Sequence, residues 1–199
     1  MRTDYQPFTI GRRFIVHPPE MKVSAVGRTP ICMDRGAFGS GEHETTRSCI
    51  EILEVLTPAE APKTVLDLGS GTAILSIAAL QLGANHAWCV DIEATAVASA
   101  RRNLRLNQLD DRATHVCGSL NQLKAVGFEL IMANIYGDVL LEVAAALVSR
   151  AVPSGHLLLS GIAWEYRFDV KKIYQALGCR LIQGQLLDDY CTLLLQRSV

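Results

Sequence analysis

The stretch VLDLGSGTAIL at residues 65–75 constrains the fold of this chain more than any other feature. It opens with a short apolar run around Asp67, which is typical of a buried strand in a parallel sheet. Gly69 and Gly71 then form a tight turn, and the apolar residues that follow recur at helical spacing as far as Leu82. A strand, a glycine turn and a helix in this order predict an α/β fold whose turn faces a ligand.

The rest of the chain alternates between predicted strands and predicted helices. Helices are expected at residues 44–56, 93–107, 139–152 and 163–177, and strands at residues 86–91, 113–117, 129–134 and 156–161. Two final strands, residues 179–187 and 190–197, lie too close in sequence for a parallel crossover and must be antiparallel. We therefore expect a Rossmann-like α/β sandwich with a mostly parallel, seven-stranded sheet that ends in an antiparallel hairpin.

Composition excludes several classes of protein. The chain has 19 basic and 20 acidic residues, so its net charge of −1 supplies no general attraction for nucleic acid, which we consider an unexpected partner. No apolar run reaches the roughly 18 residues of a membrane span, and the N-terminus lacks a signal-peptide core. We expect a cytoplasmic protein without a membrane partner. The six cysteines form no CxxC pair, which predicts free, buried thiols and no metal site.

The glycine turn leaves two kinds of cofactor to consider. A dinucleotide fingerprint would need a third glycine where this chain has Ile74, which counts against nicotinamide binding. S-adenosylmethionine is the alternative that fits better, because Asp67 precedes Gly69 and Gly71 as in class I methyltransferases. Asp91 ends the next strand, where its carboxylate would accept hydrogen bonds from both ribose hydroxyls. The competing interpretation of this aspartate is a cap for the helix that starts near residue 93.

A second motif, AFGSGEHETTR at residues 37–47, places another glycine loop before a helix. Together with VLDLGSGTAILSIAALQLGA, VDIEATAVASARRN, ANIYGDVL and LLLSGI, it resembles the ribosomal protein L11 methyltransferases over almost the whole chain. That resemblance implies an S-adenosylmethionine-dependent enzyme that releases S-adenosylhomocysteine and methylates amino groups of a protein. It also implies that Thr46, Gly69, Asp91 and Asn134 contact the cofactor.

Three departures from the family's pattern stand out. Ser40 replaces a threonine of the first motif, and Ala73 replaces the third glycine of the turn, where a positive φ would strain an alanine. Members of the family also carry an N-terminal domain that binds the ribosomal protein. This chain starts close to the segment that follows it, so we expect that domain to be absent and leave the substrate open.

The segment before the first long helix has a different character. Residues 8–17 predict a small β-ribbon with Gly11 at its turn, and the Gly- and Pro-rich residues 18–43 predict a loop. We divide the chain into an N-terminal β-ribbon and cofactor-covering loop at residues 1–43 and a methyltransferase catalytic domain at residues 44–199. The two parts together make one domain, as 199 residues allow.

The acceptor site is predicted at the end of the strand ELIMAN. Asn134 is followed by Ile135, Tyr136 and Gly137, without the prolines typical of enzymes that methylate nucleobase or glutamine nitrogens. The side-chain oxygen of Asn134 can accept a hydrogen bond from a target amine. Tyr136 is a candidate for the acceptor channel and His43 for a proton relay. The alternatives are that Asn134 caps a helix, Tyr136 packs and His43 orders its loop.

Three hypotheses about function follow. The first is a protein methyltransferase that acts on lysine or α-amino groups, possibly of a ribosomal protein. The second is a small-molecule or RNA methyltransferase, for which RNA binding would require a basic patch such as Arg101, Arg102 and Arg105. The third is a degenerate cofactor binder that serves as a scaffold.

Overall fold

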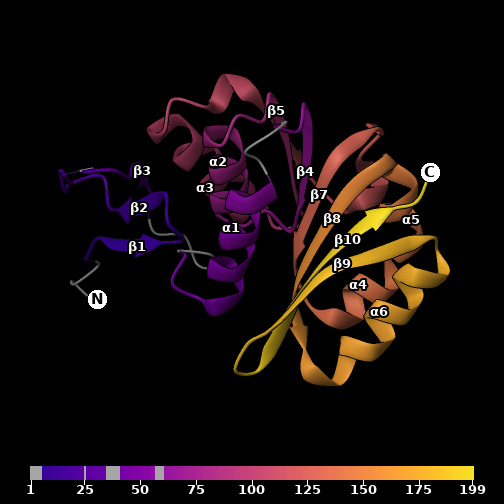
Figure 1. Ribbon diagram of the computed structural model, residues 1–199. Coiled ribbons are helices and arrows are strands. Elements are labelled where there is room, and N and C mark those ends of the chain that lie inside the picture. Colours follow the sequence, from indigo (N-terminus) through magenta and orange to yellow (C-terminus); the bar gives the residue numbers. More distant parts are fainter. Residues whose placement is uncertain (1–5, 25, 35–40, 57–60) are drawn as a thin grey trace.

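The structure is a computed structural model that describes residues 6–24, 26–34, 41–56 and 61–199 (Figure 1). Its centre is a seven-stranded sheet in the order β6-β5-β4-β7-β8-β10-β9. The strands are β4 (Thr64–Leu68), β5 (His86–Asp91), β6 (Ala113–Cys117), β7 (Phe128–Asn134), β8 (Ala151–Ala163), β9 (Cys179–Leu186) and β10 (Tyr190–Arg197). Strand β10 lies antiparallel between β8 and β9, and the remaining neighbours pair in parallel. The predicted fold class, with its C-terminal hairpin, is confirmed.

Helices cover both faces of this sheet. Figure 1 shows α1, α2 and α3 on one face and α4, α5 and α6 on the other. The helices are α1 (Glu44–Leu56), α2 (Ile74–Gln81), α3 (Ala94–Leu106), α4 (Gly137–Glu142), α5 (Ala144–Arg150) and α6 (Arg167–Ala176), and the 3₁₀ turns are η1 (Asp110–Arg112), η2 (Leu120–Gln122) and η3 (Trp164–Tyr166). The predicted α1 matches its observed bounds.

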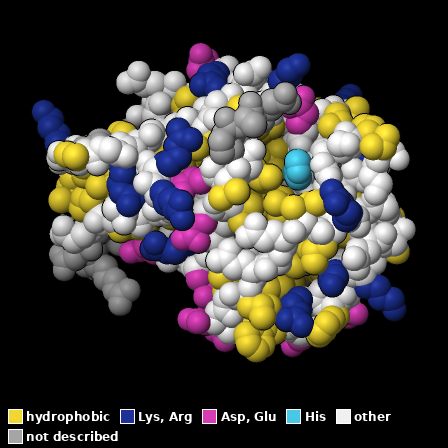
Figure 2. Space-filling model, in the orientation of Figure 1, with side chains coloured by type: hydrophobic (Ala, Val, Ile, Leu, Met, Phe, Trp, Pro, Cys, Tyr) yellow, Lys and Arg dark blue, Asp and Glu magenta, His cyan; other side chains and the backbone are white. Residues whose placement is uncertain are grey.

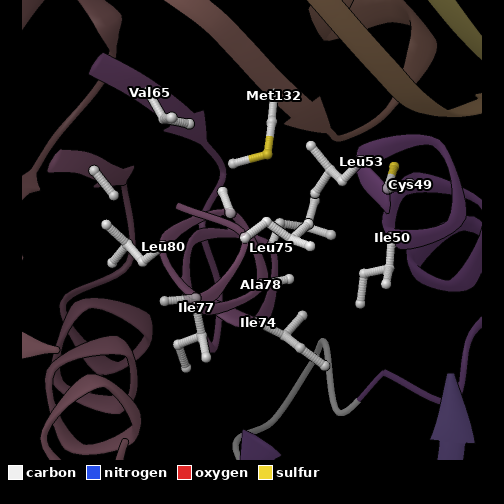
Figure 3. Close-up of a cluster of buried hydrophobic side chains, with 14 of the residues drawn as sticks. Cys49, Ile50, Leu53, Val65, Ile74, Leu75, Ile77, Ala78, Leu80 and Met132 are labelled. Carbon is white, nitrogen blue, oxygen red and sulfur yellow. The ribbon is translucent and has the colours of Figure 1, made fainter. Parts of the chain in front are cut away.

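The core consists of one apolar layer on each side of the sheet. Helix α2 is apolar on every side, and its residues from Ile74 to Leu80 are all buried, as expected for a helix enclosed by protein. Figure 3 shows Leu75 of this helix on the side that faces Leu53 of α1, while Ile77 and Leu80 lie on the opposite side and belong to the same buried cluster. The helix that follows the glycine turn is thus fixed by packing along its whole length.

The N-terminal segment forms a separate small sheet. Strands β1 (Phe8–Ile10) and β2 (Phe14–His17) pair antiparallel around Gly11, whose φ is +57°, so the predicted β-ribbon is confirmed. Strand β3 (Thr29–Cys32) pairs with β2 in parallel, and here the expectation of a loop over residues 18–43 is wrong.

Side chains outside the small sheet hold its third strand. Asn107, the residue after α3, accepts a hydrogen bond from the Cys32 amide at 2.9 Å and donates to the Cys32 carbonyl at 2.7 Å. Arg28, just before β3, donates to the carbonyls of Gly11 and Phe14 at 3.0 and 3.1 Å. Because Asn107 is distant in sequence from β3, the composition of residues 29–32 could not predict a strand.

Two further expectations need correction. The predicted helix at residues 139–152 is two short helices that meet at Val143, and β8 begins at Ala151 because this residue pairs with Phe128 of β7. The last two residues of the predicted helix, Ala151 and Val152, therefore belong to strand β8. Cys117 is exposed rather than buried, since β6 is the edge strand of the sheet.

Candidate active site

A cavity of about 1030 Å³ lies at the carboxyl ends of β4, β5 and β7. Its wall also includes the start of α1, the residues that follow β6 and the first residue of β10. The volume is at the upper end of the range for small-molecule sites, which leaves room for a cofactor and a second reactant. All eight candidate site residues line this cavity: His43, Thr46, Asp67, Gly69, Gly71, Asp91, Asn134 and Tyr136.

The glycine turn after β4 has a backbone that side chains would disturb. Gly69 has a φ of +71° and Gly71 a φ of +53°. The Gly69 amide donates to the carbonyl of Val90 in β5 at 2.8 Å. A Cβ atom on Gly69 would lie 2.3 Å from Cγ2 of Ile135, so the turn passes directly beside the segment that follows β7.

Asp67 ties this turn to the helix behind it. Its carboxylate accepts hydrogen bonds from the Ser76 hydroxyl at 2.6 Å and the Ser76 amide at 3.2 Å. Burial raises the pKa of Asp67 to about 6, although the two hydrogen bonds favour the charged form. Through these two hydrogen bonds, Asp67 fixes α2 beneath the cavity.

Asp91 joins the turn to the next helix. One carboxylate oxygen accepts from the Gly71 amide at 2.9 Å, and the other accepts from the Glu93 amide at 3.0 Å. The N-cap residue of α3 is Glu93, so Asp91 orders the turn before this helix and does not cap it. The same carboxylate is half-exposed and lines the cavity, where it can accept further hydrogen bonds.

Ala73 occupies the third glycine position with a φ of +63° and a ψ of +24°. This is the left-handed conformation that glycine adopts freely, and for alanine it costs about 1–2 kcal/mol. The Ala73 amide still donates to the Ser70 carbonyl at 2.7 Å, and its own carbonyl accepts from the Ile77 amide at 2.9 Å. The turn therefore keeps a hydrogen-bonded path into α2 at the expense of local strain.

Thr46 and Asn134, which are 88 residues apart in sequence, meet on the opposite wall of the cavity. The Asn134 amide group donates to the Thr46 hydroxyl at 3.4 Å. Gly161 at the end of β8 makes room for this pair, because a Cβ atom there would lie 3.1 Å from Oδ1 of Asn134 and 2.6 Å from the Ile135 carbonyl oxygen. Nothing in the pattern around residue 161 signalled this role.

His43 and Tyr136 are placed at the mouth of the cavity. Nδ1 of His43 lies 2.8 Å from the Thr45 hydroxyl and accepts from the Thr45 amide at 3.3 Å, which orders the start of α1. Its ring meets the ring of Tyr190 edge-on at 5.3 Å. Tyr136 is 73% exposed. The remaining parts of the 37–47 motif, residues 37–40 with Ser40, lie outside the described residues.

Sequence reasoning missed two residues at this mouth. Tyr190 lines the cavity because the β9–β10 hairpin returns its first residue to the carboxyl edge of the sheet. Glu44 holds that hairpin, since its carboxylate accepts from the Asp188 amide at 3.1 Å and the Asp189 amide at 3.4 Å. Both contacts span more than 140 residues, and no local pattern predicts them.

No group of three or more His, Cys, Asp or Glu side chains in the described ranges is arranged to hold a metal ion. No helix in these ranges has the length and hydropathy needed to cross a membrane.

The sheet order, the glycine turn after β4 and the acidic residue at the end of β5 define the class I methyltransferase fold. A sequence model of one family, the ribosomal protein L11 methyltransferases (PrmA), matches residues 1–198. The chain belongs to this family.

Individual relatives agree with this assignment. The ribosomal protein L11 methyltransferases of Trichlorobacter lovleyi and Geotalea daltonii are 42% identical over 170 residues and 37% identical over 190 residues. These alignments cover 82% and 90% of this chain but only 55% and 60% of the relatives, so the chain spans little more than half their length.

Solved structures show the same fold. The ribosomal protein L11 methylase of Lactobacillus delbrueckii subsp. bulgaricus superposes with a TM-score of 0.87 at 25% identity, over 98% of this chain and 99% of that one. An RNA methyltransferase of Salinibacter ruber, solved with S-adenosyl-L-homocysteine, superposes with a TM-score of 0.60 at 15% identity, over 76% of this chain and 91% of that one. The second similarity concerns the fold alone.

Proposed function

We propose that this chain uses S-adenosylmethionine to methylate lysine or α-amino groups of a protein, with a ribosomal protein as the candidate substrate. One observation carries the proposal: a single cavity joins the glycine turn and Asp91 on one wall to Asn134 and Thr46 on the other. Membership of the ribosomal protein L11 methyltransferase family supports the same reaction class.

The residues of the cavity fit this cofactor. The half-exposed carboxylate of Asp91 can accept from a ribose diol, and the strained turn at Gly69 and Gly71 brings backbone close to a ligand. Ile92 and Leu120 supply apolar wall beside Asp91 for a flat ring. When bound, S-adenosylmethionine supplies an electrophilic methyl group on a sulfonium cation. We assign Thr46, Asp67, Gly69, Gly71, Asp91 and Asn134 to its binding site.

The wall that carries Asn134 and Thr46, called the acceptor wall here, must receive a neutral amine. The pKa of a free lysine, about 10.4, is about 3.4 units above pH 7. Deprotonation of the amine at pH 7 therefore costs about 4.6 kcal/mol. Desolvation in the cavity lowers the pKa of such an amine, and Oδ1 of Asn134 would accept a hydrogen bond from it. Thr46 keeps the Asn134 amide in place, so this acceptor oxygen is held in one orientation. Tyr136 would line the entry, and His43 would order the wall and receive a proton at its exposed ring.

Methyl transfer can be measured with isotopically labelled S-adenosylmethionine. The purified protein is incubated with a bacterial lysate, and protein, RNA and small-molecule fractions are analysed by mass spectrometry. Label in lysine or α-amino groups of protein is the expected result. Label in RNA with none in protein would contradict the proposal, and absence of label in every fraction would favour a scaffold role.

We also propose that the two parts of the chain have different roles. Residues 44–199 would carry the catalytic machinery, and residues 1–43 would cover the cofactor, because Phe8 and Ile10 of the small sheet pack against the core beside α1 and α2. We place the reaction in the cytoplasm, where ribosomal proteins are made.

A further inference from the structure

We propose that the mouth of the cavity is a docking surface for an extended, lysine-rich segment of the protein substrate. The surface, called the acceptor rim here, consists of Tyr136, Trp164, Glu165, Asp188, Asp189 and Tyr190. The inference rests on the proposed function, since it names the kind of chain that would bring an amine to Asn134.

The aromatic members of the acceptor rim are linked through the cavity and through one hydrogen bond. Tyr136 and Tyr190 line the cavity, and Nε1 of Trp164 donates to the Tyr190 carbonyl at 3.2 Å. Tyr166, two residues after Trp164, packs against Gly137, where an added Cβ atom would lie 2.6 Å from Cβ of the tyrosine. Trp164 is 55% exposed although it is large and apolar, which marks a surface suited to the aliphatic stem of a lysine.

The charged members of the acceptor rim are all acidic. Glu165, Asp188 and Asp189 are exposed, and their carboxylates form no ion pair with the described residues. The basic residue beside them, Arg167, has its guanidinium 4.4 Å from the centre of the Phe168 ring. Figure 2 shows acidic, basic and hydrophobic side chains together along the lower edge of the molecule, where the β9–β10 hairpin and the start of α6 lie in Figure 1.

The acidic turn is held in position. Glu44 fixes the backbone of Asp188 and Asp189 from the start of α1, and Ser48 donates to Oε1 of Gln185 at 3.0 Å. The two aspartates therefore present their charges beside Tyr190 without a large loss of backbone entropy when a partner binds.

The basic patch that RNA binding would require is elsewhere and is partly neutralised. On α3, Arg102 lies 3.3 Å from a carboxylate oxygen of Asp34, and Arg105 lies 3.0 Å from one of Asp110. The exposed acidic residues of the acceptor rim attract a basic segment and repel a phosphate backbone. Charge complementarity and continuity with the cavity select a lysine-rich peptide as the occupant.

The test measures binding separately from catalysis. The intact protein, saturated with S-adenosylhomocysteine, is titrated into a fluorescent lysine-rich peptide, a peptide with one lysine between glutamates, and a single-stranded RNA of the same length. Anisotropy should show the lysine-rich peptide bound most tightly, with an affinity that falls as salt is added. The double variant Asp188→Lys/Asp189→Lys should weaken this binding by about tenfold. The matched control, Glu20→Lys/Asp111→Lys, reverses two exposed acids away from the cavity and should leave it unchanged.

Each outcome bears on one proposal. Equal loss of affinity in both double variants, or tighter binding of RNA than of the lysine-rich peptide by the unaltered protein, would overturn the docking surface. Peptide binding that depends on the two aspartates, without methyl transfer to any protein, would keep the docking surface and defeat the proposed function. Methyl transfer to protein with no dependence on the acceptor rim would support the proposed function and overturn the docking surface.

Discussion

The two walls of the cavity are built in different ways. The cofactor wall comes mainly from residues 67–93, where the Asp91 carboxylate accepts from the Gly71 amide, the Gly69 amide donates to the Val90 carbonyl, and the Asp67 carboxylate accepts from Ser76 of the buried helix α2. The acceptor wall draws on α1, β7, β8 and the C-terminal hairpin, and its outer side chains are exposed. The comparison indicates that the rigid, local turn faces the proposed cofactor. Segments that are far apart in sequence face the proposed methyl acceptor.

The largest expected effect concerns the charge inside the cofactor wall. The pKa of Asp67 is raised from 3.8 to about 6 by burial, so the folded state holds the proton more tightly than the unfolded state. Its stabilising effect is complete below pH 3.8 and is lost as the pH rises through 6, a change of about 3 kcal/mol. Urea unfolding at several pH values should show this trend in the native chain and not in Asp67→Asn. An unchanged difference between the two proteins from pH 4 to 7.5 would refute it.

The next effect separates catalysis from cofactor binding. Asn134→Ala removes the oxygen proposed to accept from the amine, and we expect kcat to fall by about a hundredfold through lost positioning. The Kd for S-adenosylhomocysteine, measured by calorimetry, should rise by a smaller factor, because Asn134 is one of six residues assigned to the cofactor and the glycine turn and Asp91 are untouched. If affinity and kcat fell together by the same factor, the division into two walls would be wrong.

Asp91→Ala tests the cofactor wall directly. Loss of the carboxylate should weaken binding of S-adenosylmethionine by about tenfold or more, or about 1.4 kcal/mol. Asp111→Ala, at an exposed carboxylate outside the cavity, is the matched control and should bind like the native protein. Native affinity in Asp91→Ala would leave Asp91 with only the structural role of bonding the Gly71 and Glu93 amides.

The smallest effect concerns strain in the turn. Ala73→Gly should relieve the cost of the left-handed conformation and raise the free energy of unfolding by about 1 kcal/mol, less the entropy that glycine gains when unfolded. Thermal unfolding measures the change, and cofactor affinity should stay within about twofold because the backbone path is already formed. A large gain in affinity would show that the Ala73 methyl group crowds the cofactor.

Much of the fold could be predicted because its signals are local. The strand before Gly69, the helix after it and the helix at residues 44–56 follow from hydrophobic periodicity and turn residues close in sequence. Strand β3 could not be predicted, since it pairs with β2 and is held by Asn107 from a distant part of the chain. The end of the helix before β8 was misjudged because pairing of Ala151 with Phe128 decides it.

The sequence by itself determined the α/β class, the glycine turn and the candidate residues on both walls, because each depends on spacing within one segment. Only the tertiary structure decided that Thr46 contacts Asn134, that β10 lies between β8 and β9, and that Tyr190 reaches the cavity. These features depend on contacts between residues 30 to 145 positions apart, whose geometry is set by how the whole sheet closes its core.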